Sequence, residues 1–153
     1  MAGNLTLAMI KPHIHFQRRA GDIIQRIEKE KFAILLCKLI QLREDGVEEF
    51  YAEHKGKDFF TRLKNSMTSG PTWVLVLGKE NAVDEWRKII GNTNPGEASP
   101  ETIRAQFGDK LNISNNAVHG SSDDWAAKRE INFFFGREIR LAEKINQIDQ
   151  QGR

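Results

Sequence analysis

The residues with the clearest potential for chemistry are His119 and Glu130. His119 stands among small residues in the segment Asn116–Ser121, just before an expected helix. An accessible imidazole can act as a nucleophile near neutral pH, because much of it is uncharged there. Glu130 lies on the expected helix, and a carboxylate bonded to one ring nitrogen would leave the other free to attack. The alternative for this segment is a structural histidine in a turn.

Three cationic side chains could supply what a phosphate-attacking nucleophile needs. Lys11 ends the first apolar run, Arg87 lies on an expected helix, and Arg104 lies in a long loop. Phosphoryl transfer depends mainly on positioning and charge neutralisation; arginine offers phosphate oxygens a forked donor, and lysine a point charge. Each cation alone could equally be a solvated surface charge. Their spacing does not show that they converge.

The hydrophobic pattern predicts the elements that must position these residues. Short apolar runs predict strands at Leu5–Ile10, Phe32–Leu42, Trp73–Leu77 and around Val118. Helices are predicted over Gly21–Lys31, Glu44–His54, Asp58–Met67, Ala82–Ile90 and from Ser122 or Asp123 to Phe134. Residues 91 to about 116 predict a long irregular loop, and such a loop in a small domain is usually functional. The tail after Arg137 begins helical and finishes polar.

The order of these elements predicts the fold class. Without the helical pair over residues 44–67, the order is βαββαβ, the ferredoxin-like sandwich of the α/β (α+β) class. We therefore predict a four-stranded antiparallel sheet with an inserted helical pair and a long loop at the site. The length of 153 residues predicts one domain, with its core at about 4–136 and a tail at 137–153.

Composition limits the setting and the partners. A net charge of +2 and a pI near 8.7 are too mild to indicate nucleic-acid or membrane binding. The single cysteine, Cys37, excludes an intramolecular disulfide, and its apolar neighbours predict that it is buried. Without a signal peptide or an apolar run near 20 residues, a reduced, cytoplasmic setting is expected. An RNA-recognition domain would share the βαββαβ order, but the first and third strand candidates contain one aromatic residue, Trp73.

From Leu5 to about Phe135 the sequence resembles the nucleoside diphosphate kinase family. The matching segments occur in the family's order along the chain. They are Ile10-Lys11-Pro12, Met67-Thr68-Ser69-Gly70-Pro71, Arg87, Gly91-Asn92-Thr93-Asn94-Pro95, Thr102-Ile103-Arg104, Asn116 through Ser121, Glu130-Ile131 and Phe134-Phe135. The histidine segment is highly specific to this family.

The resemblance implies an enzyme that transfers the γ-phosphate of an NTP, typically ATP, to an NDP by a ping-pong mechanism through a phosphohistidine at His119. Glu130 would hydrogen-bond the ring, Ser121 would support the same network, and Phe59 would stack on the base opposite Ile113. Side chains holding phosphates and ribose would be Lys11, Tyr51, Arg87, Thr93, Arg104 and Asn116. Mg²⁺ would be held mainly by the nucleotide's phosphates, without a protein metal site. The family also implies a homo-oligomer, a hexamer or a tetramer.

The chain departs from the family pattern at three places. His13 and His15 follow Lys11-Pro12 where an acidic residue is usual, and two histidines at this spacing are expected to have a surface or loop role rather than to bind a metal. Ser122 replaces the acid after His-Gly-Ser, which could alter a helix cap or a metal contact. The stretch from Arg104 to Asn116 is about two residues longer than usual. The departures at His13 and Ser122 support one alternative, a catalytically silent binding or regulatory protein.

Overall fold

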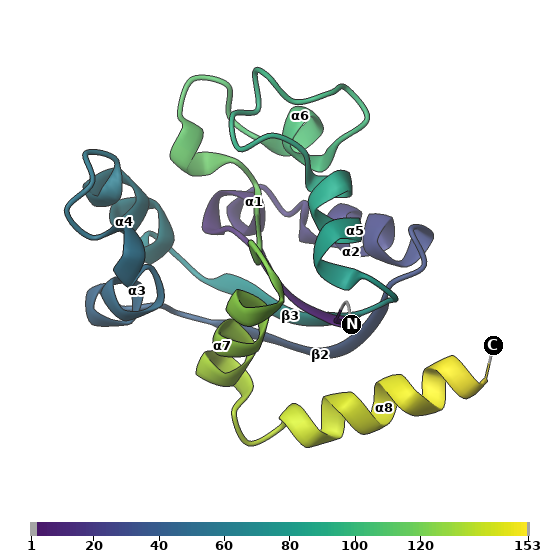
Figure 1. Ribbon diagram of the computed structural model, residues 1–153. Coiled ribbons are helices and arrows are strands. Elements are labelled where there is room, and N and C mark those ends of the chain that lie inside the picture. The colour runs from purple at the N-terminus through teal and green to yellow at the C-terminus, as the bar shows by residue number, and fades with distance from the viewer. Residues whose placement is uncertain (1–2, 153) are drawn as a thin grey trace.

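The computed structural model describes residues 3–152 (Figure 1). Its strands are β1 (Leu5–Ile10), β2 (Ala33–Ile40), β3 (Thr72–Gly78) and β4 (Val118–Gly120). Its helices are α1 (Pro12–Phe16), α2 (Ala20–Lys29), α3 (Glu44–Phe50), α4 (Phe60–Thr68), α5 (Ala82–Ile90), α6 (Ile103–Phe107), α7 (Asp124–Phe135) and α8 (Ile139–Gln151). Two short 3-10 helices are η1 (Ala52–His54) and η2 (Ile113–Asn115).

The four strands form one antiparallel sheet in the order β2-β3-β1-β4. The central strand β1 pairs along its whole length with β3, from Leu5 opposite Gly78 to Ile10 opposite Trp73. Its other edge pairs with β4, where Met9 lies opposite His119. This topology confirms the predicted ferredoxin-like sandwich, with the helices α3 and α4 inserted between β2 and β3.

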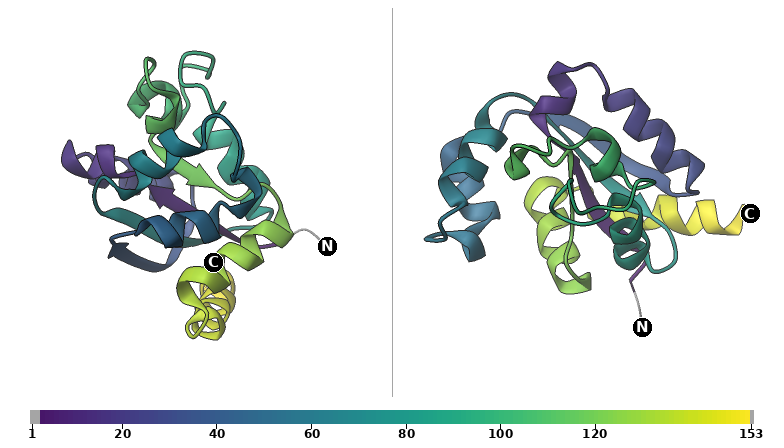
Figure 2. Two further views of the ribbon diagram at one scale, coloured as in Figure 1. Left: turned by 90° about the vertical axis from the view of Figure 1, so that its left-hand side faces the viewer. Right: turned by 90° about the horizontal axis from the view of Figure 1, so that it is seen from above.

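Alternation along β1 divides the core into two layers, because successive side chains of a strand point to opposite faces. Ala8 and Ile10 pack with residues of α2 and α5 on one face, while Leu7 and Met9 pack with residues of α3, α4 and α7 on the other. Figures 1 and 2 show α2 and α5 on one side of the sheet and α7 and α8 on the other. The buried sheet fixes the ends of β1 and β4, where the candidate chemistry lies.

Two segments predicted as irregular contain short helices. Pro12 starts α1, where the fixed φ of proline suits the first helical position. The long loop contains α6 and η2. The N-cap of α6 is Thr102, whose hydroxyl accepts a hydrogen bond from the Ala105 N–H at 3.3 Å. The tail remains helical to Gln151, because α8 buries Ala142 and Asn146.

Burial of the second strand was predicted wrongly. β2 is an edge strand, so its apolar run is not covered as the central strands are. Of its eight residues Leu35 is buried, and the predicted core cysteine, Cys37, is exposed. The helical spacing of apolar residues over Asp58–Met67 also predicts that Phe59 packs in the core, but Phe59 is 40% exposed.

Candidate active site

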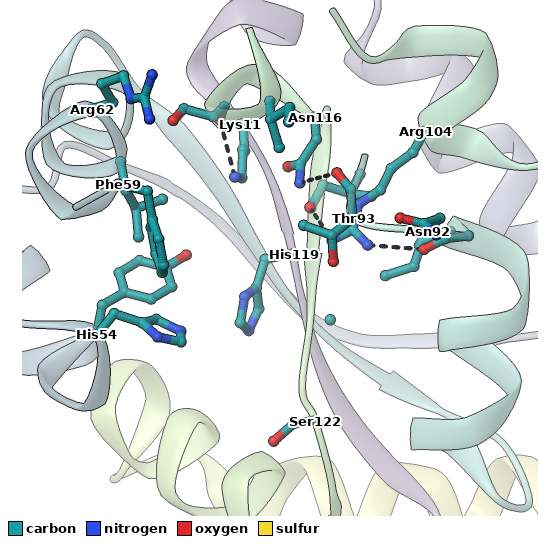
Figure 3. Close-up of a pocket in the computed structure, with 18 of the residues that line it drawn as sticks. Lys11, His54, Phe59, Arg62, Asn92, Thr93, Arg104, Asn116, His119 and Ser122 are labelled. Atoms are coloured by element: carbon teal, nitrogen blue, oxygen red, sulfur yellow. Dashed lines mark hydrogen bonds between the residues drawn. The ribbon is translucent and has the colours of Figure 1, made fainter. Parts of the chain in front are cut away.

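His119 is presented by a kinked connection into β4. Ala117, two residues earlier, has φ +76°, a conformation that costs a non-glycine residue roughly 1–2 kcal/mol. Two hydrogen bonds hold it: its carbonyl accepts from the Lys11 N–H, and its N–H donates to Nε2 of His13, both at 2.9 Å. The Trp86 indole N–H donates to the His119 carbonyl at 3.1 Å. The backbone that carries His119 is therefore anchored from three elements, and Figure 3 shows its ring in the middle of a pocket.

Glu130 and Ser121 fix the imidazole. Nε2 of His119 lies 2.7 Å from Oε1 of Glu130, and the Ser121 hydroxyl donates to the same oxygen at 2.9 Å. A carboxylate only accepts, so Nε2 carries the ring proton. Nδ1 of His119 then holds the lone pair, and it has no hydrogen-bond partner among residues 3–152. The arrangement leaves one defined nitrogen available for attack.

Two aromatic rings pack edge-on against the imidazole. The ring centroids of Phe50 and Tyr51 lie 5.4 and 5.9 Å from that of His119. Burial raises the pKa of the Tyr51 hydroxyl, and the nearby Glu130 carboxylate raises it further. Tyr51 is therefore a neutral hydrogen-bonding group at physiological pH. The sequence did not predict Phe50 as a site residue. Phe50 directly precedes Tyr51, but that adjacency alone gives no sign that its ring contacts His119.

The three predicted cations converge on the same pocket. Lys11 is 5% exposed, and its Nζ donates to the Ser114 carbonyl at 3.2 Å. Burial and the neighbouring Arg104 lower the Lys11 pKa to about 7. Burial, followed by the charge of Arg87, lowers the Arg104 pKa to about 10, so Arg104 remains charged at neutral pH. Such clustering of cations is stabilised by an anionic ligand.

Two buried polar atoms in this region have no partner within the described part of the chain. They are Nε of Arg104 and Oδ1 of Asn116. The neighbouring nitrogens each have a partner: Nη1 and Nη2 of Arg104 donate to the carbonyls of Gly91 and Val118 at 2.9 and 3.0 Å, and Nδ2 of Asn116 donates to the Thr93 carbonyl at 2.9 Å. Because buried polar groups normally find partners, these two atoms mark places where a ligand could bind.

Phe59 and Ile113 present exposed apolar surfaces at the pocket mouth. They are 40% and 48% exposed and lie at the N-terminus of α4 and in η2. Ser66 of α4 ties the two elements together, because its hydroxyl donates to the Ser114 carbonyl at 3.2 Å and to Oδ1 of Asn115 at 2.6 Å. An aromatic face beside an aliphatic side chain suits a flat heterocycle.

The pocket has a volume of about 1070 Å³, ample for a nucleotide. Ten of the eleven predicted site residues line it: Lys11, Tyr51, Phe59, Arg87, Thr93, Arg104, Ile113, Asn116, His119 and Glu130. The eleventh, Ser121, lies buried behind Glu130. Sequence reasoning missed several lining residues, among them Phe50, Glu53, His54, Arg62 and Asn92.

The unusual histidines are not loop residues. His13 and His15 lie on α1, where His13 accepts the Ala117 N–H and Nδ1 of His15 accepts the Trp73 indole N–H at 3.2 Å. The expected surface or loop role is therefore wrong, because both rings make specific tertiary hydrogen bonds. Burial, followed by the charge of Lys11, lowers the His13 pKa to about 4. A neutral His13 therefore accepts the hydrogen bond that holds the backbone just before β4.

Protonation of His13 should destabilise the fold. An ordinary histidine pKa of about 6.5 in the unfolded chain exceeds the folded value of about 4, so stability is complete above pH 6.5 and falls as the pH drops toward 4. His13→Gln keeps a neutral acceptor and should lose less stability over this interval. Urea unfolding at pH 7.5, 5.5 and 4.5 measures the difference. Identical pH slopes for the two proteins would contradict this role.

The displaced acid after Ser121 still caps its helix. Asp123 is the N-cap of α7, and its Oδ1 accepts the Ala126 N–H at 2.7 Å. Ser122 is exposed and lines the pocket. The longer stretch between Arg104 and Asn116 places Leu111, which is 98% exposed, at the pocket rim. These departures leave the His119–Glu130 geometry in place.

The chain matches known proteins along most of its length. The family model described as nucleoside diphosphate kinase matches residues 4–139. A nucleoside diphosphate kinase of Histophilus somni is 46% identical over 130 residues, which are 85% of this chain and 91% of that protein. A crystal form of the Aquifex aeolicus nucleoside diphosphate kinase has a TM-score of 0.82 at 36% identity, covering 86% and 94% of the two chains. The Halobacterium salinarum enzyme in complex with CDP has a TM-score of 0.83 at 33% identity, covering 89% and 90%.

Proposed function

The chain belongs to the nucleoside diphosphate kinase family, and from that premise we propose that its phosphotransfer runs through His119. Nucleoside diphosphate kinase activity makes the protein a phosphotransferase. The observation that carries the proposal is the 2.7 Å contact between Nε2 of His119 and Glu130, which leaves Nδ1 facing the pocket without a partner among residues 3–152.

The first half-reaction transfers a phosphoryl group to the enzyme. The lone pair of Nδ1 attacks the γ-phosphorus of the triphosphate, the bond from that phosphorus to the β–γ bridging oxygen breaks, and the diphosphate leaves with the bond's electrons. The positive charge on the phosphorylated imidazole is stabilised by Glu130 at Nε2. In the second half, a β-phosphate oxygen of another diphosphate attacks the same phosphorus, and the N–P bond returns its electrons to Nδ1.

The remaining residues would bind and orient the nucleotide. Lys11, Arg87 and Arg104 would offset charge on the phosphates, and the unpartnered Oδ1 of Asn116 could accept a ribose hydroxyl. Tyr51 and Thr93 would supply neutral hydrogen bonds, and Phe59 and Ile113 would enclose the base. Stacking through an aromatic face tolerates every base.

Mg²⁺ would accompany the nucleotide. The pocket's cationic lining fits a polyphosphate, while one of its carboxylates, Glu130, is engaged by His119 and Ser121. We therefore propose that phosphate oxygens supply most of the metal's ligands. When bound, the ion would neutralise part of the negative charge of the phosphates.

Steady-state kinetics test the proposed route. With ATP and Mg²⁺ as donor and GDP as acceptor, reciprocal plots at several fixed GDP concentrations should give parallel lines, because the first product leaves before the second substrate reacts. Converging lines would indicate direct transfer in a ternary complex and contradict a phosphoenzyme.

Nucleotide binding should take up a proton through Lys11. With a pKa of about 7 in the free protein, most Lys11 is neutral at pH 8, and bound phosphates should raise that pKa. Titration calorimetry of ADP binding in buffers of different ionisation enthalpy should show an uptake approaching ~0.9 proton at pH 8. Lys11→Gln should abolish it, whereas the exposed Lys110→Gln control should not. Uptake that persists in Lys11→Gln would assign the proton elsewhere.

We also propose that the chain assembles as a homo-oligomer, a hexamer or a tetramer. The edge strand β2 and the exposed Leu39 on it support an interface, since exposed sheet edges are normally covered. Light scattering should then give six or four times the chain mass of 17.5 kDa.

Within residues 3–152 no helix combines the length and apolar character needed to cross a bilayer. The cytoplasmic location stays a prediction.

A further inference from the structure

We propose that Arg62 reads the nucleotide base and favours guanine over adenine. The inference rests on the proposed function and deepens it, because it assigns a specificity-determining residue in the part of the pocket that otherwise accepts any base. Neither phosphate transfer nor base stacking requires an arginine here. Its position, its free donors and the hydrogen-bonding pattern of purines carry the argument.

Arg62 stands on the face of α4 that looks toward η2. It follows Phe59 by three residues and precedes Ser66 by four, so the three side chains share one helical face. This face contacts η2, because the Ser66 hydroxyl donates to the Ser114 carbonyl and to Oδ1 of Asn115. Arg62 therefore lies between the exposed Phe59 ring and the bridge that closes α4 onto η2.

The guanidinium group of Arg62 is available to a ligand. Arg62 is exposed and lines the pocket, and Figure 3 shows it on the same wall as Phe59, extending toward the side where Lys11 lies. It has no hydrogen bond or ion pair with any residue from 3 to 152. Arg104, by contrast, already donates to two carbonyls. Arg62 is thus a pocket arginine whose forked donors are uncommitted.

A purine lying between Phe59 and Ile113 would turn one edge toward Arg62. Guanine presents two adjacent acceptors, O6 and N7, which match the forked donors of arginine. Adenine presents N7 beside the N6 amino group, and that donor has no acceptor to meet on a guanidinium. We expect a guanine preference of about tenfold in binding, the lower part of the range for such a pair, because the site is exposed.

Calorimetric binding of GDP, ADP and IDP tests this assignment. IDP carries O6 and N7 but lacks the 2-amino group, so it should bind like GDP. Wild type should bind GDP and IDP about tenfold more tightly than ADP. In Arg62→Ala that ratio should approach one, mainly through weaker GDP and IDP binding. Arg62→Lys, which keeps the charge without the fork, should also reduce it. Arg140→Ala, an exposed arginine outside the pocket, should leave the ratio unchanged.

Three results would overturn the inference. Equal weakening of GDP and ADP in Arg62→Ala would place the guanidinium on the phosphates. An unchanged ratio of GDP to ADP affinity in Arg62→Ala would show that the guanidinium does not contact the base. IDP binding as weakly as ADP would mean that the 2-amino group of guanine is recognised instead. If wild type bound none of the three diphosphates, the proposed nucleotide site itself would be wrong, which separates that failure from the failure of base reading.

Discussion

His119→Ala should lower ATP–GDP exchange by on the order of 10⁴-fold or more, because losing the nucleophile removes the covalent route altogether. The pocket would keep its cations and its base site, so nucleotide binding should change little by comparison. A coupled assay of ADP release, run beside calorimetric binding of ADP, measures both effects. The expected signature is lost turnover with retained binding.

His54 provides the matched control, since it is a second imidazole on the same pocket. Its Nδ1 lies 3.3 Å from Nζ of Lys57, and its Nε2 lies 3.8 Å from a Glu53 oxygen, so no carboxylate fixes this ring at hydrogen-bond distance as Glu130 fixes Nε2 of His119. His54→Ala should still form a covalent phosphoenzyme. Exchange in His119→Ala equal to that of wild type would show that another group accepts the phosphate.

Glu130→Gln should reduce kcat by on the order of 10²-fold with little change in KM. The carboxylate fixes the ring proton on Nε2 and stabilises the charged imidazole, whereas an amide can present a donor to Nε2 and weaken both effects. Glu130 holds the nucleophile rather than the nucleotide, so binding should be nearly unchanged. Steady-state kinetics give the split between kcat and KM.

Ser121→Ala is the natural comparison for that variant. It removes one hydrogen bond to Glu130, at 2.9 Å, while leaving the carboxylate against His119. Its effect on kcat should therefore be smaller than that of Glu130→Gln. A Glu130→Gln enzyme with wild-type kcat, or one that loses activity through KM alone, would be inconsistent with the orienting role.

The fold was predictable where local signals and burial agree. Leu5–Ile10 and Ala82–Ile90 were predicted with the boundaries that β1 and α5 have, because the first is buried and the second is strongly amphipathic. The predicted burial of Cys37 was wrong, because an apolar run does not reveal whether its strand is central or at the edge of the sheet. The short helix α1 was missed because it combines Pro12 with two histidines and has no apolar period long enough to detect.

The candidate site was predictable in its parts more than in its assembly. The interval between His119 and Glu130 placed a carboxylate on the following helix, and the structure puts it on the ring. The convergence of Lys11 and Arg104 depends on pairing between β1 and β4 and on the course of the loop, which spacing does not encode. The hydrogen bond from Ala117 to His13 likewise joins residues 104 positions apart.

Isolation of the phosphoenzyme tests the central claim most directly. The protein is incubated with ATP and Mg²⁺, separated from nucleotide, and examined by ³¹P NMR and by mapping of the modified peptide. We expect one acid-labile phosphate on Nδ1 of His119 that is discharged by GDP to give GTP. A phosphate on Nε2, on a residue other than His119, or one that GDP does not remove would contradict the account.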